Sequence, residues 1–287
     1  MLLTLRALSM NSNELKHNLL VAYPYVNKAV IEALKEREPQ IRFVLDSGAF
    51  TAWKAGKPIA LDDYCRFLET LPIKPWRYFT LDVIGDPEGS MKNYEIMLKR
   101  GFKPVPIFTR GEKPEMIEEY YKTSDVVGIG GLVGTQGNKG FVNGVMKQIA
   151  GRKVHWLGFT AIDYIKYYKP YMCDSSSWSS GIRYGSLALY QGNGKFKLVN
   201  RKTFVEKPSN EIFALLQKHG IPLDDLGKSH HWVNGGGNRA LRNASFRAWA
   251  MFQHDITTKV GSHFFLACAS ESDIRTFYSA FDWMKGK

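Results

Sequence analysis

The sequence predicts an α/β protein of the (β/α)8, or TIM-barrel, type. From Ile41 to about Trp178, short apolar runs alternate with longer amphipathic stretches. This alternation is typical of repeated βα units around a parallel sheet. At 287 residues with 44% hydrophobic content, the chain can bury one large core or two modest ones. We therefore expect a single barrel domain over 1–287.

Eight segments are candidate strands of this barrel. Six lie in the alternating region, at 41–46, 77–83, 103–108, 125–131, 153–159 and 169–176. An earlier run at 18–25 and a late run at 262–270 could supply the remaining two. Helices are expected between the six strands, at 61–71, 89–101, 113–124, 141–151 and 161–169.

The character of the sequence changes after Trp178. The segment 186–199 is expected to form a β-hairpin, because its central Gly-Asn-Gly can supply the positive φ angles of a tight turn. Two helices are expected to follow, over 210–220 and 238–254. We interpret about 181–258 as a basic insertion, so that the C-terminal third adds a hairpin and a helical segment to the barrel.

The chain is basic, with 39 Lys and Arg against 27 Asp and Glu and a formal net charge of +12. Such an excess favours a polyanionic partner such as DNA, RNA or an anionic membrane surface. The alternative is that the charge only keeps the protein soluble. No apolar stretch reaches the roughly 18 residues of a membrane helix, and the start becomes polar too early for a signal peptide. We expect a soluble, cytoplasmic protein that does not act at a membrane.

The cysteines give no sign of a disulfide framework, a redox pair or a zinc knuckle. Cys65, Cys173 and Cys268 lie far apart, and no Cys-x-x-Cys pair is present, so a reducing compartment fits. The remaining candidate metal ligands are His230, His231, His254 and His263, together with Cys268. Their spacing matches no standard motif, and polar surface or core histidines are the favoured interpretation. We expect no metal.

Several expected strands end in polar residues or glycines. These ends are Asp46-Ser47-Gly48, Asp82, Gly130-Gly131, Gly158 and Asp174-Ser175. Because the carboxyl ends of the strands form the active-site face of a βα barrel, Asp46, Asp82 and Asp174 would converge on one mouth. The alternative interpretation is that each aspartate caps the N-terminus of the helix that follows it. Two carboxylates at one site suit chemistry at an anomeric carbon, where one attacks and the other moves protons.

Three motifs then resemble the queuine and archaeosine tRNA-guanine transglycosylases. Residues 45–50 (LDSGAF) resemble the family's Asp-Ser-Gly-Gly-Phe segment, and 128–134 (GIGGLVG) resemble its Gly-Gly-Leu loop. Residues 155–178 resemble the segment that runs from a Leu-Met-Gly strand to the nucleophilic aspartate. The forms Asp-Ser-Gly-Ala-Phe and Asp-Ser-Ser-Ser-Trp are closer to the 7-deazaguanine DNA transglycosylases of bacteria and phages. The resemblance covers roughly 41–180.

The resemblance implies that guanine in a nucleic acid is exchanged for a 7-deazaguanine, without a cofactor. Asp174 would attack the sugar C1′ and form a covalent glycosyl-enzyme, and Asp46 would deprotonate the incoming base at N9. Asp82 would read the Watson–Crick edge of the purine. The other implied base-binding residues are Ser47, Phe50 and Leu157 and the amides of Gly130 and Gly131, with Phe50 and Leu157 on the two faces of the heterocycle.

The sequence departs from the family at positions that bear on which nucleic acid is the substrate. The tRNA enzymes carry a Cys-x-Cys-x-x-Cys plus His zinc site that supports RNA binding, and this sequence has no such cluster. We therefore expect the polymer substrate to be DNA rather than tRNA, and the incoming base to be a 7-deazaguanine such as preQ0. A guanine inside a duplex must be unstacked before its C1′ is reachable. Phe108-Thr109-Arg110 replace the family's Val-Gln-Gly strand end, so recognition of the incoming base is expected to differ.

Candidate contacts to the nucleic-acid backbone lie in the C-terminal third. Arg239 and Arg242 are three apart, on one face of a helix that follows a glycine run, and a flexible loop with a solvated helix explains them equally well. Weaker candidates are Arg183, Lys195 and Lys197. Three alternative functions stay open: a tRNA transglycosylase, a catalytically silent nucleic-acid-binding barrel subunit, and an unrelated barrel lyase of a phosphorylated metabolite.

Overall fold

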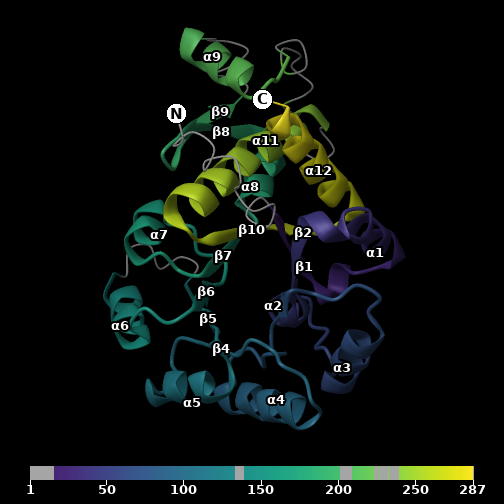
Figure 1. Ribbon diagram of the computed structural model, residues 1–287, viewed down its shortest axis with the longest axis vertical. Helices are drawn as coiled ribbons and strands as arrows, with labels where there is room; N and C mark the ends of the chain where they lie inside the picture. The colour runs from purple at the N-terminus through teal and green to yellow at the C-terminus, as the bar shows by residue number, and fades with distance from the viewer. Residues whose placement is uncertain are drawn as a thin grey trace, which may run out of the picture.

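The computed structural model describes residues 16–132, 139–200, 209–222, 226, 232 and 239–286. Eight parallel strands form one curled sheet that is flanked by helices (Figure 1). The strands are β1 (His17–Ala22), β2 (Ile41–Asp46), β3 (Arg77–Tyr78), β4 (Ile107–Phe108), β5 (Val127–Ile129), β6 (Val154–Trp156), β7 (Met172–Ser175) and β10 (His263–Cys268). Each lies in or overlaps one of the eight candidate segments, so the predicted strands are confirmed.

The strand order is β3-β2-β1-β10-β7-β6-β5-β4, and hydrogen bonds also join its two ends. The Val105 N–H donates to the Tyr78 carbonyl at 2.8 Å, and the Thr80 N–H donates to the Val105 carbonyl at 3.0 Å. Phe79 and Val105 form a parallel bridge between these bonds. The curled sheet is therefore consistent with a TIM-like barrel.

Helices follow the strands along the chain. They are α1 (Lys28–Lys35), α2 (Ala49–Lys54), α3 (Leu61–Thr70), α4 (Pro87–Lys99), α5 (Glu115–Thr123), α6 (Lys139–Ile149), α7 (Ile162–Tyr168), α8 (Ser177–Arg183), α11 (Arg239–Asp255) and α12 (Glu271–Lys285). The five helices predicted between the six central strands are confirmed as α3 to α7. Among the residues that the structure describes, no helix is both long and apolar enough to cross a membrane.

Side chains alternate between two apolar clusters along β1, β2, β4, β7 and β10. In β2, Phe43 and Leu45 belong to the large cluster that packs with the helices, whereas Val44 belongs to a smaller cluster on the other face. The smaller cluster draws on most of the strands, and its members include Leu20, Phe79, Met172 and Phe265. This period of two fills the inside of the curled sheet and leaves the strand ends free to carry polar groups.

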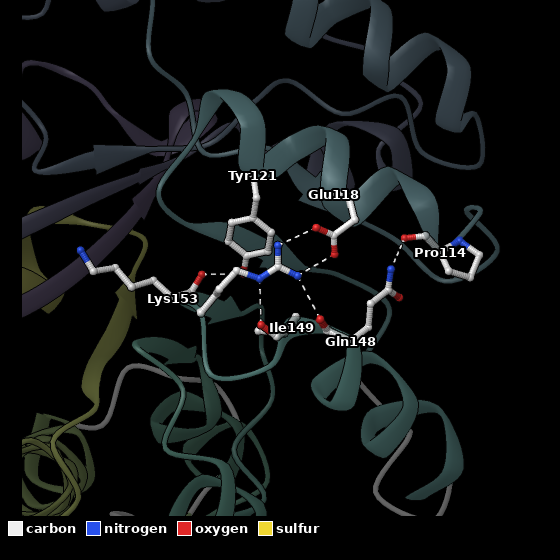
Figure 2. A network of polar contacts seen from close by, with 7 residues as sticks. Pro114, Glu118, Tyr121, Gln148, Ile149 and Lys153 are labelled. Carbon is white, nitrogen blue, oxygen red and sulfur yellow. Dashed lines mark hydrogen bonds and ion pairs between the residues drawn. The ribbon is translucent and has the colours of Figure 1, made fainter.

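A guanidinium network ties α5 to α6 beside β6 (Figure 2). Arg152 donates to both carboxylate oxygens of Glu118, at 2.8 and 2.7 Å, and its guanidinium lies 4.1 Å from the centre of the Tyr121 ring. It also donates to the carbonyls of Gln148 and Ile149. The chain enters β6 two residues after Arg152, so this network fixes the start of that strand.

The predicted hairpin forms from β8 (Ser186–Gly192) and β9 (Lys195–Asn200). Its turn has positive φ angles at Gly192, Asn193 and Gly194, as its Gly-Asn-Gly sequence predicts. The predicted helices of this region are confirmed as α9 (Asn210–Lys218) and α11. The hairpin and α9 lie at the opposite end of the molecule from α4 and α5 (Figure 1).

Candidate active site

The ends of β1, β2, β7 and β10 surround a pocket of about 490 Å³. These four strands are neighbours in the sheet, so the pocket collects residues from distant parts of the sequence. Asp46 and Asp174 both line it, together with Phe50, Trp178 and Arg242. The two aspartates that the sequence singles out as a catalytic pair therefore share one pocket.

Asp46 is the last residue of β2, and the turn that follows it is tight. Gly48 has a φ of +73°, and its N–H donates to Asp46 Oδ1 at 2.5 Å. A Cβ on Gly48 would lie 2.2 Å from Cδ of Pro24. Only glycine fits this left-handed position against Pro24, and the turn that it permits holds the Asp46 carboxyl group at the wall of the pocket.

The surroundings of Asp46 favour its neutral form. Burial raises the pKa of Asp46 to about 6, and the negative charge of Asp174 acts in the same direction, while the Gly48 N–H and His155 oppose the rise. A carboxyl group with a pKa near 6 can both give and take a proton close to neutral pH. Asp46 therefore has the protonation behaviour of a general acid and base.

Asp174 is held by the strand beside it. Its Oδ1 accepts the N–H of Gly158 at 3.0 Å and lies 2.9 Å from Nε2 of His155. His155 belongs to β6 and is fully buried, and its ring packs against Phe79 with 4.8 Å between ring centres. The carboxylate is thus oriented from one side, while its other side faces the pocket that it lines.

His155 is a site residue that the sequence analysis did not identify. The signal was present, because Val154 and Trp156 on either side of it are apolar and pack toward the helices. Alternation along the strand therefore turns His155 to the inside of the curled sheet, where a polar residue requires a partner.

Asp82 lies near this pair without lining its pocket. Burial raises the pKa of Asp82 well above its usual range, and the negative charges of Asp46 and Glu112 raise it further. Its Oδ1 is buried and has no hydrogen-bond partner within the described part of the chain. Asp82 therefore favours a neutral carboxylic acid, which can donate a hydrogen bond.

None of the three aspartates is the N-cap of the helix that follows it. Gly48 holds the N-cap position of α2, Asp86 that of α4 and Ser176 that of α8. The Asp86 side chain makes the capping bond of α4 by accepting the Gly89 N–H at 3.0 Å. The alternative explanation for aspartates at these strand ends therefore does not apply.

The remaining predicted base-binding residues are spread around the mouth. Ser47 is buried, and Phe50 is 59% exposed at the rim of the pocket. The Gly130 N–H already donates to the Phe108 carbonyl at 2.8 Å. That amide is engaged in the sheet, so Gly131 is the better candidate donor to a base carbonyl.

Leu157 and Gly131 belong to strand ends further round the sheet. Leu157 packs against the inner apolar cluster, and its N–H donates to the Ile129 carbonyl. Gly131 has a φ of +67° and lies close to Arg110. Neither residue lines the pocket of Asp46 and Asp174, so the pocket unites only part of the predicted base-binding set.

Arg242 is the one predicted nucleic-acid contact among the described residues that lines the pocket. Its Nη1 donates to Ser272 Oγ at 3.0 Å and lies 3.5 Å from Asp273 Oδ1. Asp273, which the sequence analysis did not identify, is buried and lines the same pocket. Arg242 also lines a neighbouring cleft of about 510 Å³ together with Arg239 and Arg275.

The hairpin lysines lie elsewhere. Lys197 pairs with Glu211 at 2.8 Å, and Lys195 is exposed at the start of β9. Neither residue lines the pocket. The side chain of Arg183 lies outside the described part of the structure.

Those candidate metal ligands that the structure describes do not form a cluster. His263 begins β10 beside Arg42, whereas Cys268 ends the same strand at the pocket. His230 and His231 lie outside the described residues. Across the described ranges, no group of three or more His, Cys, Asp or Glu side chains could hold a metal ion.

A search of family models and of curated proteins found no match to this chain. The site itself therefore carries the functional argument. It combines one carboxylate fixed by two contacts with a second carboxyl group that titrates near neutral pH, at a pocket large enough for a nucleoside. This arrangement suits a displacement in which one group attacks carbon and the other moves a proton.

Proposed function

We propose that this protein is a DNA-guanine transglycosylase that exchanges guanine for a 7-deazaguanine such as preQ0. The observation that carries the proposal is the meeting of Asp46 and Asp174 in one pocket. Its scaffold would be a complete (β/α)8 barrel, with about 181–258 inserted between the seventh and eighth strands. The resemblance of 45–50, 128–134 and 155–178 to guanine transglycosylases supplies the substrate class.

Asp174 is the proposed nucleophile. One of its oxygens bonds to C1′ of the target nucleotide as the C1′–N9 bond to guanine breaks, and the bonding electron pair leaves with N9. The product is a covalent glycosyl-enzyme, in which the sugar is held until a second base arrives. The burial of Asp174 and its contacts to His155 and Gly158 support this role, because they fix the carboxylate in one orientation.

Asp46 is the proposed proton carrier for both half-reactions. While Asp174 is charged, it helps to raise the pKa of Asp46 to about 6, which favours a protonated Asp46 that can give its proton to the departing guanine. Formation of the ester removes the charge of Asp174 and so favours the Asp46 carboxylate. That carboxylate then takes the N9 proton of the incoming base, and the enzyme returns to its starting state.

The proposed polymer is DNA, and the charge distribution supports a polyanion. The net charge is +12, and Arg242 lines the same pocket as Asp46 and Asp174. Phe50 is exposed beside Asp46 and offers a ring on which a base can stack. A guanine displaced from its stack could enter the pocket while its strand stays outside.

The proposal is tested by incorporation. The protein is incubated with duplex DNA and preQ0, and the DNA is digested to nucleosides and analysed by mass spectrometry, with tRNA treated in parallel. We expect the deazaguanine nucleoside in DNA and none with the Asp174→Asn variant. Incorporation into tRNA alone would support the tRNA transglycosylase instead. Absence from both polymers, with a folded protein, would refute the proposed function.

A further inference from the structure

We infer that His155 and the Gly158 amide assign different tasks to the two oxygens of Asp174. They hold Oδ1, so that Oδ2 is the oxygen that attacks C1′, and they keep Oδ1 in place as the carbonyl oxygen of the resulting ester. This inference rests on the proposed function and makes His155 a positioning residue.

Both contacts to the Asp174 carboxylate fall on the same atom. The Gly158 N–H donates to Oδ1 at 3.0 Å, and Nε2 of His155 lies 2.9 Å from Oδ1. Gly158 has a φ of +62°, a left-handed conformation that favours glycine and aims its N–H at β7. No hydrogen bond to Oδ2 is formed by any residue that the structure describes. Oδ2 is therefore the oxygen available to a substrate.

The contacts of His155 favour a proton on Nε2, the ring nitrogen that faces Asp174 Oδ1. The Nδ1 atom is buried and has no hydrogen-bond partner among the described residues. A proton on Nδ1 would bury an unsatisfied N–H, and a bare Nε2 would point a lone pair at the carboxylate. The Nε2–H tautomer satisfies the contact to Asp174 and leaves only an acceptor unpaired, which is the more readily tolerated case.

The two donors act in both directions of the exchange. When Oδ2 bonds to C1′, the negative charge leaves with guanine, and Oδ1 becomes the ester carbonyl without moving. When N9 of the incoming base bonds to C1′, the C1′–Oδ2 electron pair returns to the carboxylate and the charge spreads onto Oδ1. The N–H groups of His155 and Gly158 stabilise that returning charge, so they accelerate the release of the sugar from Asp174.

The kinetic test removes and then restores the donor at position 155. His155→Leu deletes the donor in a buried position, whereas His155→Gln offers an amide N–H. His17→Leu is the matched control, because His17 is also fully buried and lies outside the pocket. We expect kcat to fall about 100-fold in His155→Leu, with KM for the incoming base nearly unchanged and partial recovery in His155→Gln. Equal losses in the Leu and Gln variants, or an unchanged kcat in a folded His155→Leu protein, would overturn the inference.

A second measurement needs no exchange activity. The 15N NMR spectrum of the histidine-labelled protein without substrate should show His155 protonated on Nε2 only, with a shift of that signal in Asp174→Ala. A proton on Nδ1 overturns the inference even if the enzyme exchanges bases. The expected tautomer in a protein that exchanges no base supports the contact and refutes only the proposed function.

Discussion

Asp46 carries a cost in stability that follows from its position. Its folded-state pKa of about 6 lies above the ordinary aspartate pKa of 3.8, mainly because the group is buried. The folded protein therefore holds a proton on Asp46 over a pH range in which the unfolded chain has released it. Stability contributed by this group is complete below pH 3.8 and is lost as the pH rises to about 6. Burial of this carboxyl group therefore lowers the stability of the folded protein at neutral and alkaline pH, as is often found at functional sites.

The first prediction is that Asp46→Asn stabilises the protein at alkaline pH. The amide is isosteric, can still accept the Gly48 N–H and cannot ionise. We expect the free energy of unfolding to rise by about 3 kcal/mol at pH 8 and to change by less than about 1 kcal/mol at pH 4, while base exchange is lost. Urea denaturation at the two pH values measures this, with the exposed Asp163→Asn as the control. A gain that is equal at both pH values would contradict the assigned pKa shift.

At the scale of elements, the turn between β2 and α2 connects the fold to the site. The chain leaves the sheet at Asp46, reverses at Gly48 and starts α2 at Ala49. The close approach of Pro24 leaves no room for a side chain at Gly48. The glycine of the Asp-Ser-Gly motif therefore has a steric reason that is independent of catalysis.

Two glycine substitutions separate this steric effect from backbone strain. Gly48 and Gly56 both have positive φ angles, at +73° and +66°, but a Cβ on Gly56 would meet nothing within 4 Å. We expect Gly56→Ala to cost about 1 kcal/mol and Gly48→Ala to cost clearly more, with loss of exchange as Asp46 shifts. Thermal denaturation and the incorporation assay measure both effects. Equal losses of stability in the two variants would contradict the steric argument, because they would mean that Pro24 moves aside for the new methyl group.

The positions of the strands and central helices could be predicted because their apolar periodicity is strong, whereas the extent of β4 could not. The segment 103–108 was expected to be a strand throughout, yet β4 covers only Ile107–Phe108. Pro104 and Pro106 have no N–H to donate, so they interrupt the ladder. The short helices α2 and α8 were missed because one or two turns carry too little periodicity to be read.

The helix α12 was also missed, although its signals are in the sequence. Ser270 caps it by accepting the Asp273 N–H, and its buried Ile274, Phe277, Tyr278 and Phe281 follow the helical spacing. The contact between His155 and Asp174 is different in kind, because it depends on the pairing of β6 with β7, which periodicity within one segment does not reveal.

For the whole molecule, the order of the strands in the curled sheet is what creates the site. The strand β1, the first in the described part of the chain, lies between β2 and β10, so strands from the early and the late parts of the sequence meet at the pocket. Asp46 from the first quarter, Asp174 from the middle and Arg242 from the last quarter then line one cavity. The convergence of Asp46 and Asp174 could be predicted from the barrel topology, but the presence of Asp273 in the same pocket could not.

The central claim is that Asp174 forms a bond to the sugar, and its most direct test is the covalent adduct. The protein is mixed with a guanine-containing DNA oligonucleotide without an incoming base, denatured, and examined by intact mass and peptide mapping. We predict an adduct on the peptide that contains Asp174, absent in Asp174→Asn and discharged when guanine or preQ0 is added before denaturation. An adduct on another residue, or base exchange that persists in Asp174→Asn, would contradict the account.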